Sequence, residues 1–222
     1  FVRWQADLPP ALTENYFRSI AAQGVFYATQ NPPGPVQLNC QFREPFERSL
    51  PSLPSGSRIH FASPRMIPPP TETVAKRGVI LIGDIGSDPR PILKLAKRLE
   101  WPVFADILSN ARLHPSSEQI RHFDWILKKG PGLEPDFILH FGRRMTSKKL
   151  LDWAPTLHVS TLPFLEDPSR RLSARLVCDI EPFCETFEAG TDPAWLPEWK
   201  ALDAAVDAVS EEQFRLDFSL TE

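Results

Sequence analysis

From residue 78 onward the chain alternates short apolar runs with segments of helical periodicity, and this alternation restricts the possible folds more than any other feature. We expect strands at 78–83, 101–105, 136–141, 156–160 and 174–179. We expect helices from Asp88, with Pro89 at the first helical position, to about Glu100, at 117–129 with Ser116 or Ser117 as cap, at 146–153 and at 197–209. Repeated strand–helix units favour parallel pairing with helices packed against the sheet. The sequence therefore predicts an α/β fold, a Rossmann-like, doubly wound, mainly parallel sheet with helices on both faces.

The first third of the chain has a different pattern. A helix is expected at 12–30, with Thr13 and Glu14 at its start, and a strand at 36–42. The segment after residue 43 is rich in proline, which forbids regular secondary structure over most of its length. We therefore divide the chain into an N-terminal segment at 1–42, a proline-rich linker at 43–73, an α/β domain at 74–190 and a terminal helix with a further linker at 191–222.

Composition excludes several classes of protein. The chain has 25 Lys and Arg residues against 28 Asp and Glu residues, and the formal net charge of −3 gives no general attraction to nucleic acid or an anionic membrane. No apolar run approaches the roughly 20 residues that span a bilayer, and no secretory signal is visible. The three cysteines form no CxxC pair, which fits a reducing compartment. We expect a cytoplasmic protein, and since the first residue is Phe1 we expect a piece of a longer polypeptide.

A basic segment follows the expected strand at 136–141. Thr146 is the expected N-cap of a short helix, yet Lys148 and Lys149 stand in its first turn, where the helix dipole disfavours positive charge. The carboxyl ends of parallel strands are where open α/β sheets bind ligands. We therefore predict that Lys148 and Lys149 bind an anionic ligand; the alternative is that they are only solvated side chains.

A second anion site is suggested by residues that follow the expected strand at 101–105. Ser109 and Arg112 lie just beyond that strand, and Arg144 lies beyond the strand at 136–141. If the two strands are neighbours, both guanidinium groups converge with Ser109 on a carboxylate or phosphate. The alternative is that Arg112 pairs with a surface carboxylate.

Two glycine motifs are weaker. Gly83-Asp-Ile-Gly86 follows the first strand of the α/β region, but the third glycine and the acidic ribose partner of a dinucleotide site are missing. A tight strand-to-helix turn explains the glycines better. Gly83 and Asp84 with Asn110 faintly imitate a metal–diphosphate motif, but Ser109 stands where a paired asparagine is needed, and we reject this interpretation.

The histidines and tryptophans do not indicate a site. The five histidines have no metal-ligand spacing, and we interpret His140 and His158 as hydrogen-bonded core or strand-end residues. Trp101, Trp125 and Trp153 fit packing between helices and sheet better than a stacking platform for bases. No motif supports a nucleophilic enzyme.

Three separated stretches resemble one known family. They are GPVQLNCQFREPF at 34–46, WPVFADILSNAR at 101–112 and FGRRMTSKKLLDW at 141–153. They are similar to the motifs GPVHxNxPFxEPL, WPxxADxLSxxR and GxxxTxKRLxxW of the thiamine diphosphate-dependent 2-succinyl-5-enolpyruvyl-6-hydroxy-3-cyclohexene-1-carboxylate synthases of menaquinone biosynthesis. The chain departs from the motifs at Gln41, Phe46 and Lys149, and the last change loses the forked geometry of arginine. The resemblance is weak after about residue 160.

The resemblance implies a role for each part of the chain. Residues 1–42 would be the tail of the pyrimidine-binding domain, residues 74–190 the central domain, and residues 191–222 the lead to a C-terminal domain. The intact enzyme would decarboxylate 2-oxoglutarate on thiamine diphosphate, held by Mg²⁺ or Mn²⁺, and add the succinyl unit to isochorismate. Because the activating glutamate and the metal motif belong to other domains, we expect this chain to bind no cofactor and to catalyse nothing alone.

Further expectations follow from the resemblance. Lys148 and Lys149 match positions that lend positive charge to the substrate pocket, and the intact enzyme is expected to be a homodimer or homotetramer. Independently of the resemblance, the predicted convergence of Ser109, Arg112 and Arg144 at adjacent strand ends suggests a site for an aromatic acid that acts as a feedback effector. Two alternatives stay open, namely the central domain of another thiamine diphosphate enzyme, such as an acetolactate synthase-like protein, and a non-catalytic nucleotide-binding or interaction module.

Overall fold

The computed structural model describes residues 2–9, 13–30, 32–41, 66–69, 71–130, 132–150, 153–162 and 171–219. The chain divides into two compact units, residues 1–64 and 65–222. Most of the segment predicted as a proline-rich linker at 43–73 lies outside the described residues, namely residues 43–65 and Pro70.

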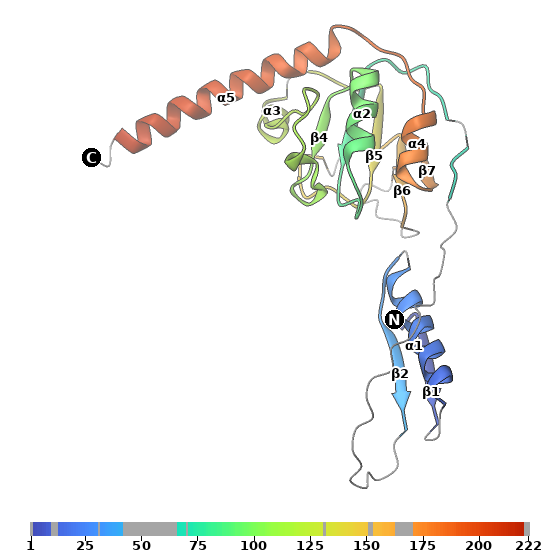
Figure 1. Cartoon of the computed structure of the whole chain (residues 1–222). Helices are drawn as coiled ribbons and strands as arrows, with labels where there is room; N and C mark the ends of the chain where they lie inside the picture. The colour runs from blue at the N-terminus through green and yellow to red at the C-terminus, as the bar shows by residue number, and fades with distance from the viewer. Residues whose placement is uncertain are drawn as a thin grey trace. The chain divides into compact units, whose positions relative to one another are not determined.

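The described residues of the first unit form one helix and two strands (Figure 1). Helix α1 spans Glu14–Thr29, and the Thr13 side chain accepts a hydrogen bond from the Tyr16 backbone N–H at 3.3 Å, as expected of an N-cap. Strand β1 (Trp4–Leu8) pairs in parallel with β2 (Val36–Cys40). The helix and β2 confirm the sequence prediction, whereas β1 was not predicted.

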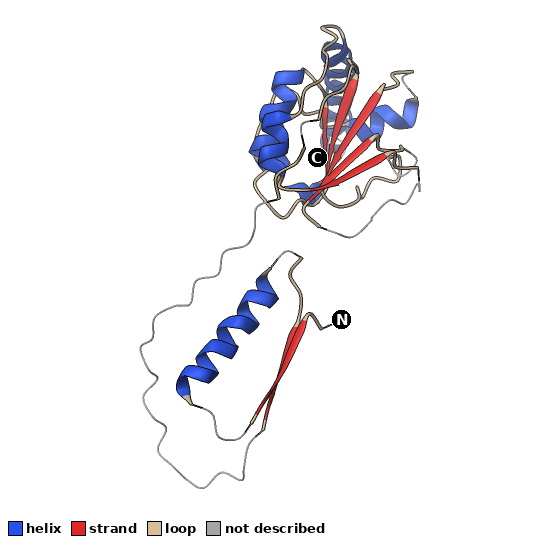
Figure 2. Cartoon of the chain, turned by 90° about the vertical axis from the view of Figure 1, so that its right-hand side faces the viewer, coloured by secondary structure: helices blue, strands red, loops and turns tan. Residues whose placement is uncertain are grey.

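The second unit contains a five-stranded sheet in which every pairing is parallel. Its strands are β3 (Gly78–Ile82), β4 (Val103–Ala105), β5 (Phe137–Phe141), β6 (Leu157–Ser160) and β7 (Ala174–Val177), in the spatial order β4-β3-β5-β6-β7. Figure 2 shows these strands fanning out between helices. The order reverses at β3, so the topological switch point lies between β3 and β5. The predicted α/β fold is confirmed.

Helices cover both faces of this sheet, and β3 is therefore buried on both sides. Its side chains alternate: Ile80 and Ile82 belong to one apolar core with α2 (Arg90–Leu99) and α4 (Ile180–Thr186), and Val79 and Leu81 belong to a second core. The second core includes residues of α3 (Phe123–Lys129) and α5 (Trp195–Ser219). This explains why β3 reads as an uninterrupted apolar run.

Several helices differ from the prediction. Helix α4 was missed, and α5 is much longer than the expected 197–209. Helix α3 begins at Phe123 and not at 117, because the Ser116 and Ser117 hydroxyls bond the carboxylate of Glu118 instead of capping a helix. Backbone bonds between Val103 and residues 118 and 120 then hold that stretch against β4. No helix of the described residues is long and apolar enough to cross a membrane.

Candidate anion-binding site

The loops that follow β3 and β5 are in close backbone contact at the switch point. The Gly83 N–H donates to the Phe141 carbonyl at 2.9 Å, and the Arg143 N–H donates to the Asp84 carbonyl at 2.8 Å. A Cβ atom at Gly83 would overlap the Arg143 carbonyl, and a Cβ atom at Gly142, where φ is 79°, would overlap that of Asp84. The crevice between β3 and β5 is therefore filled by backbone. The glycines serve this close approach and do not line an open dinucleotide site.

Two buried histidines are hydrogen-bonded to the backbone of the loop that follows β5. His140 and His158 are register partners on β5 and β6, with ring centroids 5.0 Å apart. The Nε2 atom of His140 donates to the Arg143 carbonyl at 2.9 Å, and that of His158 donates to the Gly142 carbonyl at 2.6 Å. Their interpretation as hydrogen-bonded strand-end residues is confirmed.

Asp106 joins the loop after β4 to the loop after β5. Its carboxylate is buried, with 3% of the residue exposed. One oxygen accepts from the Leu108 N–H at 3.0 Å, and the other accepts from the N–H and hydroxyl of Thr146 at 2.6 and 2.8 Å. Three hydrogen bonds converge on this one buried side chain, so Asp106 fixes the start of the basic segment. Sequence reasoning missed it, although an aspartate directly after an apolar strand was a usable signal.

The predicted helix at 146–153 is wrong over the residues that the structure describes there, 146–150 and 153. They form turns, with the Leu150 N–H donating to Ser147 at 3.3 Å and the Trp153 N–H donating to Leu150 at 3.1 Å. Thr146 donates both its N–H and its hydroxyl to Asp106, which holds this residue in the loop. The argument from the helix dipole for Lys148 and Lys149 therefore falls, and their position must be judged from the surrounding surface.

Lys148 and Lys149 line a groove of about 420 Å³. The residues that line it are Asp124, Trp125, Lys128, Thr146, Ser147, Lys148 and Lys149. The Ser147 hydroxyl donates to the Asp124 carboxylate, which ties the turn to α3. Three ammonium groups thus face one carboxylate, and the groove suits an anion. The tryptophan prediction is wrong for Trp125, which is 61% exposed here, whereas Trp101 is fully buried as predicted.

The second predicted anion site does not have the expected geometry. Strands β4 and β5 are not neighbours, since β3 lies between them. The Ser109 hydroxyl is buried, donates to the Asp106 carbonyl at 2.7 Å and accepts from the Ala111 N–H at 3.2 Å. The Arg112 Nε donates to the Ala105 carbonyl at 2.9 Å, and its guanidinium lies 5.9 Å from the ring centroid of Phe123. Arg112 is therefore not paired with a surface carboxylate through Nε, and Arg144 is exposed on the neighbouring loop.

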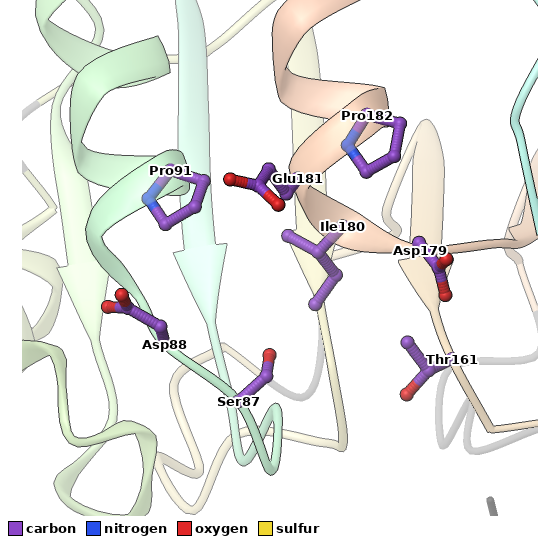
Figure 3. Close-up of a pocket in the computed structure, with 8 residues that line it drawn as sticks. All are labelled: Ser87, Asp88, Pro91, Thr161, Asp179, Ile180, Glu181 and Pro182. Carbon is purple, nitrogen blue, oxygen red and sulfur yellow. The ribbon is translucent and has the colours of Figure 1, made fainter. Parts of the chain in front are cut away.

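A separate cavity of about 340 Å³ lies between the starts of α2 and α4 (Figure 3). It is lined by Ser87, Asp88, Pro91, Thr161, Asp179, Ile180, Glu181 and Pro182. A hydrogen bond from Arg90 lowers the pKa of Asp88 to about 2, so this carboxylate is charged at neutral pH. Three carboxylates make the cavity unfavourable for an anion, in contrast to the groove at Lys148 and Lys149.

The described residues do not fit a metal-bound diphosphate. They contain no group of three or more His, Cys, Asp or Glu side chains that could hold a metal ion. The Asp84 carboxylate accepts from the Gly86 N–H at 3.1 Å, within its own loop.

The chain belongs to a family of thiamine diphosphate enzymes: residues 65–222 match the family model called "Middle domain of thiamine pyrophosphate". Within that class, the resemblance to the 2-succinyl-5-enolpyruvyl-6-hydroxy-3-cyclohexene-1-carboxylate synthases is confirmed. The chain is 29% identical to the synthase of Rubrobacter xylanophilus, over 100% of the chain and 44% of the relative. It is 26% identical to that of Salinibacter ruber, over 100% and 45%, and 30% identical to that of Aeromonas salmonicida, over 72% and 33%. The chain thus spans less than half the length of these curated relatives.

Proposed function

We propose that this chain is the central domain of a longer enzyme of menaquinone biosynthesis, a transferase that decarboxylates 2-oxoglutarate and adds the succinyl unit to isochorismate. The observation that carries the proposal is the groove lined by Lys148 and Lys149 at the carboxyl edge of the sheet. The relatives of this domain are 2-succinyl-5-enolpyruvyl-6-hydroxy-3-cyclohexene-1-carboxylate synthases. Both substrates carry two carboxylates. A positively charged wall is therefore what such an enzyme needs from this domain.

In this proposal Lys148 and Lys149 bind substrate carboxylates, and Asp106 positions them. The bonds from Asp106 to Thr146 hold the backbone two residues before Lys148. The Ser147–Asp124 bond holds the intervening residue. Lysine at position 149 supplies a point charge and not a planar fork, so it can follow a carboxylate that changes position during the reaction.

The cofactor and the assembly complete the proposal. Thiamine diphosphate, held together with Mg²⁺ or Mn²⁺ by other domains of the longer enzyme, supplies the decarboxylation chemistry. The chain alone is therefore inactive. The enzyme is a cytoplasmic homodimer or homotetramer. The effector site expected at Ser109, Arg112 and Arg144 is not part of the proposal, because β3 separates the two strands that would bring these residues together and the Ser109 hydroxyl bonds the backbone of its own loop.

The test is a steady-state assay of the full-length enzyme with 2-oxoglutarate and isochorismate. Lys148→Ala and Lys149→Ala should each lower kcat/KM by about tenfold, the effect of losing roughly 1.4 kcal/mol of interaction with a carboxylate. Lys129→Ala removes the same charge from an exposed residue of α3 that does not line the groove, and it should behave as wild type.

The outcomes separate the alternatives. Absence of product from these two substrates in a folded, cofactor-loaded enzyme would refute the reaction. Turnover of pyruvate alone would favour an acetolactate synthase-like enzyme. Normal kinetics in both alanine variants would refute the assignment of Lys148 and Lys149.

A further inference from the structure

The groove has a second wall, formed by Trp125 and Lys128, to which the proposed function assigns no role. Trp125 and Lys128 are three residues apart on α3 and so lie on the same side of the helix. The Lys128 ammonium lies 5.3 Å from the centroid of the Trp125 ring, and both residues line the groove opposite the turn at 146–149. Trp125 is 61% exposed, which is unusual for the largest side chain type.

This wall is held in place relative to the lysine turn. The Ser147 hydroxyl donates to Asp124, the residue next to Trp125. On its inner side α3 is anchored by Phe123 and Ile126, which are almost fully buried in the apolar core. The indole and the three ammonium groups are therefore carried by two segments that are bonded to each other, and not by independent loops.

The combination of these groups selects a particular kind of ligand. The indole offers a flat apolar face, and the lysines offer positive charge around it. A ligand with a six-membered ring and two carboxylates can pack its ring on the indole while its carboxylates contact the lysines. A linear dicarboxylate can use only the charges. A volume of about 420 Å³ lies within the range of small-molecule sites.

We propose that Trp125 and Lys128 bind the cyclic substrate and give the groove its preference for a ring-containing dicarboxylate over a linear one. This rests on the proposed function, in which Lys148 and Lys149 bind substrate carboxylates. In that reaction the cyclic substrate is isochorismate and the linear one is 2-oxoglutarate.

The experiment compares the Michaelis constants of the two substrates in the full-length enzyme. Trp125→Ala and Lys128→Ala should raise KM for isochorismate by about tenfold and leave kcat and KM for 2-oxoglutarate within about twofold of wild type. Trp125→Phe and Lys128→Arg keep the flat face and the charge, and they should retain most of the affinity. Lys129→Ala is the matched control, with the same helix, charge and exposure.

A binding measurement that does not depend on turnover uses cyclohexane-1,3-dicarboxylate and glutarate as probes in calorimetry. Wild type should bind the cyclic probe more tightly, and Trp125→Ala should abolish that preference. Equal affinity for both probes in wild type would overturn the inference. If Lys148→Ala and Lys149→Ala lower kcat/KM while Trp125→Ala and Lys128→Ala match Lys129→Ala, this inference fails and the proposed function stands. If none of the four differs from the control, the assignment of Lys148 and Lys149 fails as well, whereas the proposed reaction fails only if no product forms.

Discussion

At the scale of single residues, Asp106 determines how the candidate site is built. A buried carboxylate with three donors connects two loops that belong to non-adjacent strands. Lys148 and Lys149 were found from the sequence because charge is visible there, but Asp106 was not, because its partner Thr146 is 40 residues away. The sequence thus reveals the charged residues of a loop better than the distant residues that hold the loop in place.

Asp106→Asn should destabilise the protein by about 1–3 kcal/mol, because the new amide brings N–H donors to a place where donors are already aimed. Thermal unfolding measures this as a lower melting temperature. Glu134→Gln removes one negative charge from an exposed position and should leave the melting temperature unchanged. Equal melting temperatures for the two variants would contradict the role given to Asp106.

At the scale of elements, prediction succeeded where a segment is defined by its own side chains and failed where distant partners decide. Strand β3 was found because all of its residues are buried, so its apolar run is continuous. The helix expected at 146–153 was wrong, and the N–H and hydroxyl of Thr146 donate to the distant Asp106, which holds the segment as a loop. Helix α3 starts late because residues 118–120 bond to β4 instead. Neither competing contact is visible in the local pattern.

Helix α5 is hydrogen-bonded to Arg121 and His122, the two residues that precede α3. The His122 N–H donates to Asp203 at 2.7 Å, and the His122 ring and Arg121 contact Asp207 at 3.0 and 2.7 Å. The hydrogen bond from His122 is the main reason that the pKa of Asp207 lies below its usual range. A carboxyl group whose pKa is lowered by folding stabilises the folded state above its unfolded pKa of about 3.9, and this stabilisation is lost as the pH falls through the lowered value.

Acidification below about pH 4 should therefore speed amide hydrogen exchange in the α3-facing part of α5 relative to β3, after correction for intrinsic rates. Asp207→Asn should give the faster exchange already at neutral pH and lose the acid-dependent step. A wild-type ratio that stays constant from pH 6 to about pH 3 would argue against this fastening.

At the scale of the whole molecule, the chain consists of two units with very different burial. The α/β unit has two apolar cores, whereas Val36–Cys40 in the first unit has no fully buried residue. The three cysteines are free. Cys40 lies in the first unit and is exposed, whereas Cys178 and Cys184 lie in the second unit and are buried. Burial raises the pKa of Cys178 to about 11 and raises that of Cys184 as well.

A thiol reagent at pH 8 should therefore react quickly with Cys40 alone, and with Cys178 and Cys184 only after unfolding. Mass spectrometry of the labelled peptides identifies the sites. Cys40→Ser should abolish the fast phase and leave the slow one. Fast labelling of Cys184 in the native protein would be inconsistent with its position in the core.

The contact between the loops at Gly83 and Arg143 has a wider meaning for this domain. An open α/β sheet ordinarily receives its nucleotide or cofactor where the strand order reverses, and here the main chain itself occupies that space. A ligand of this domain must then bind away from the switch point, as in the groove lined by Lys148 and Lys149. A domain whose switch point is closed by its own backbone is suited to forming one wall of a binding pocket that it shares with neighbouring domains, and poorly suited to enclosing a ligand by itself.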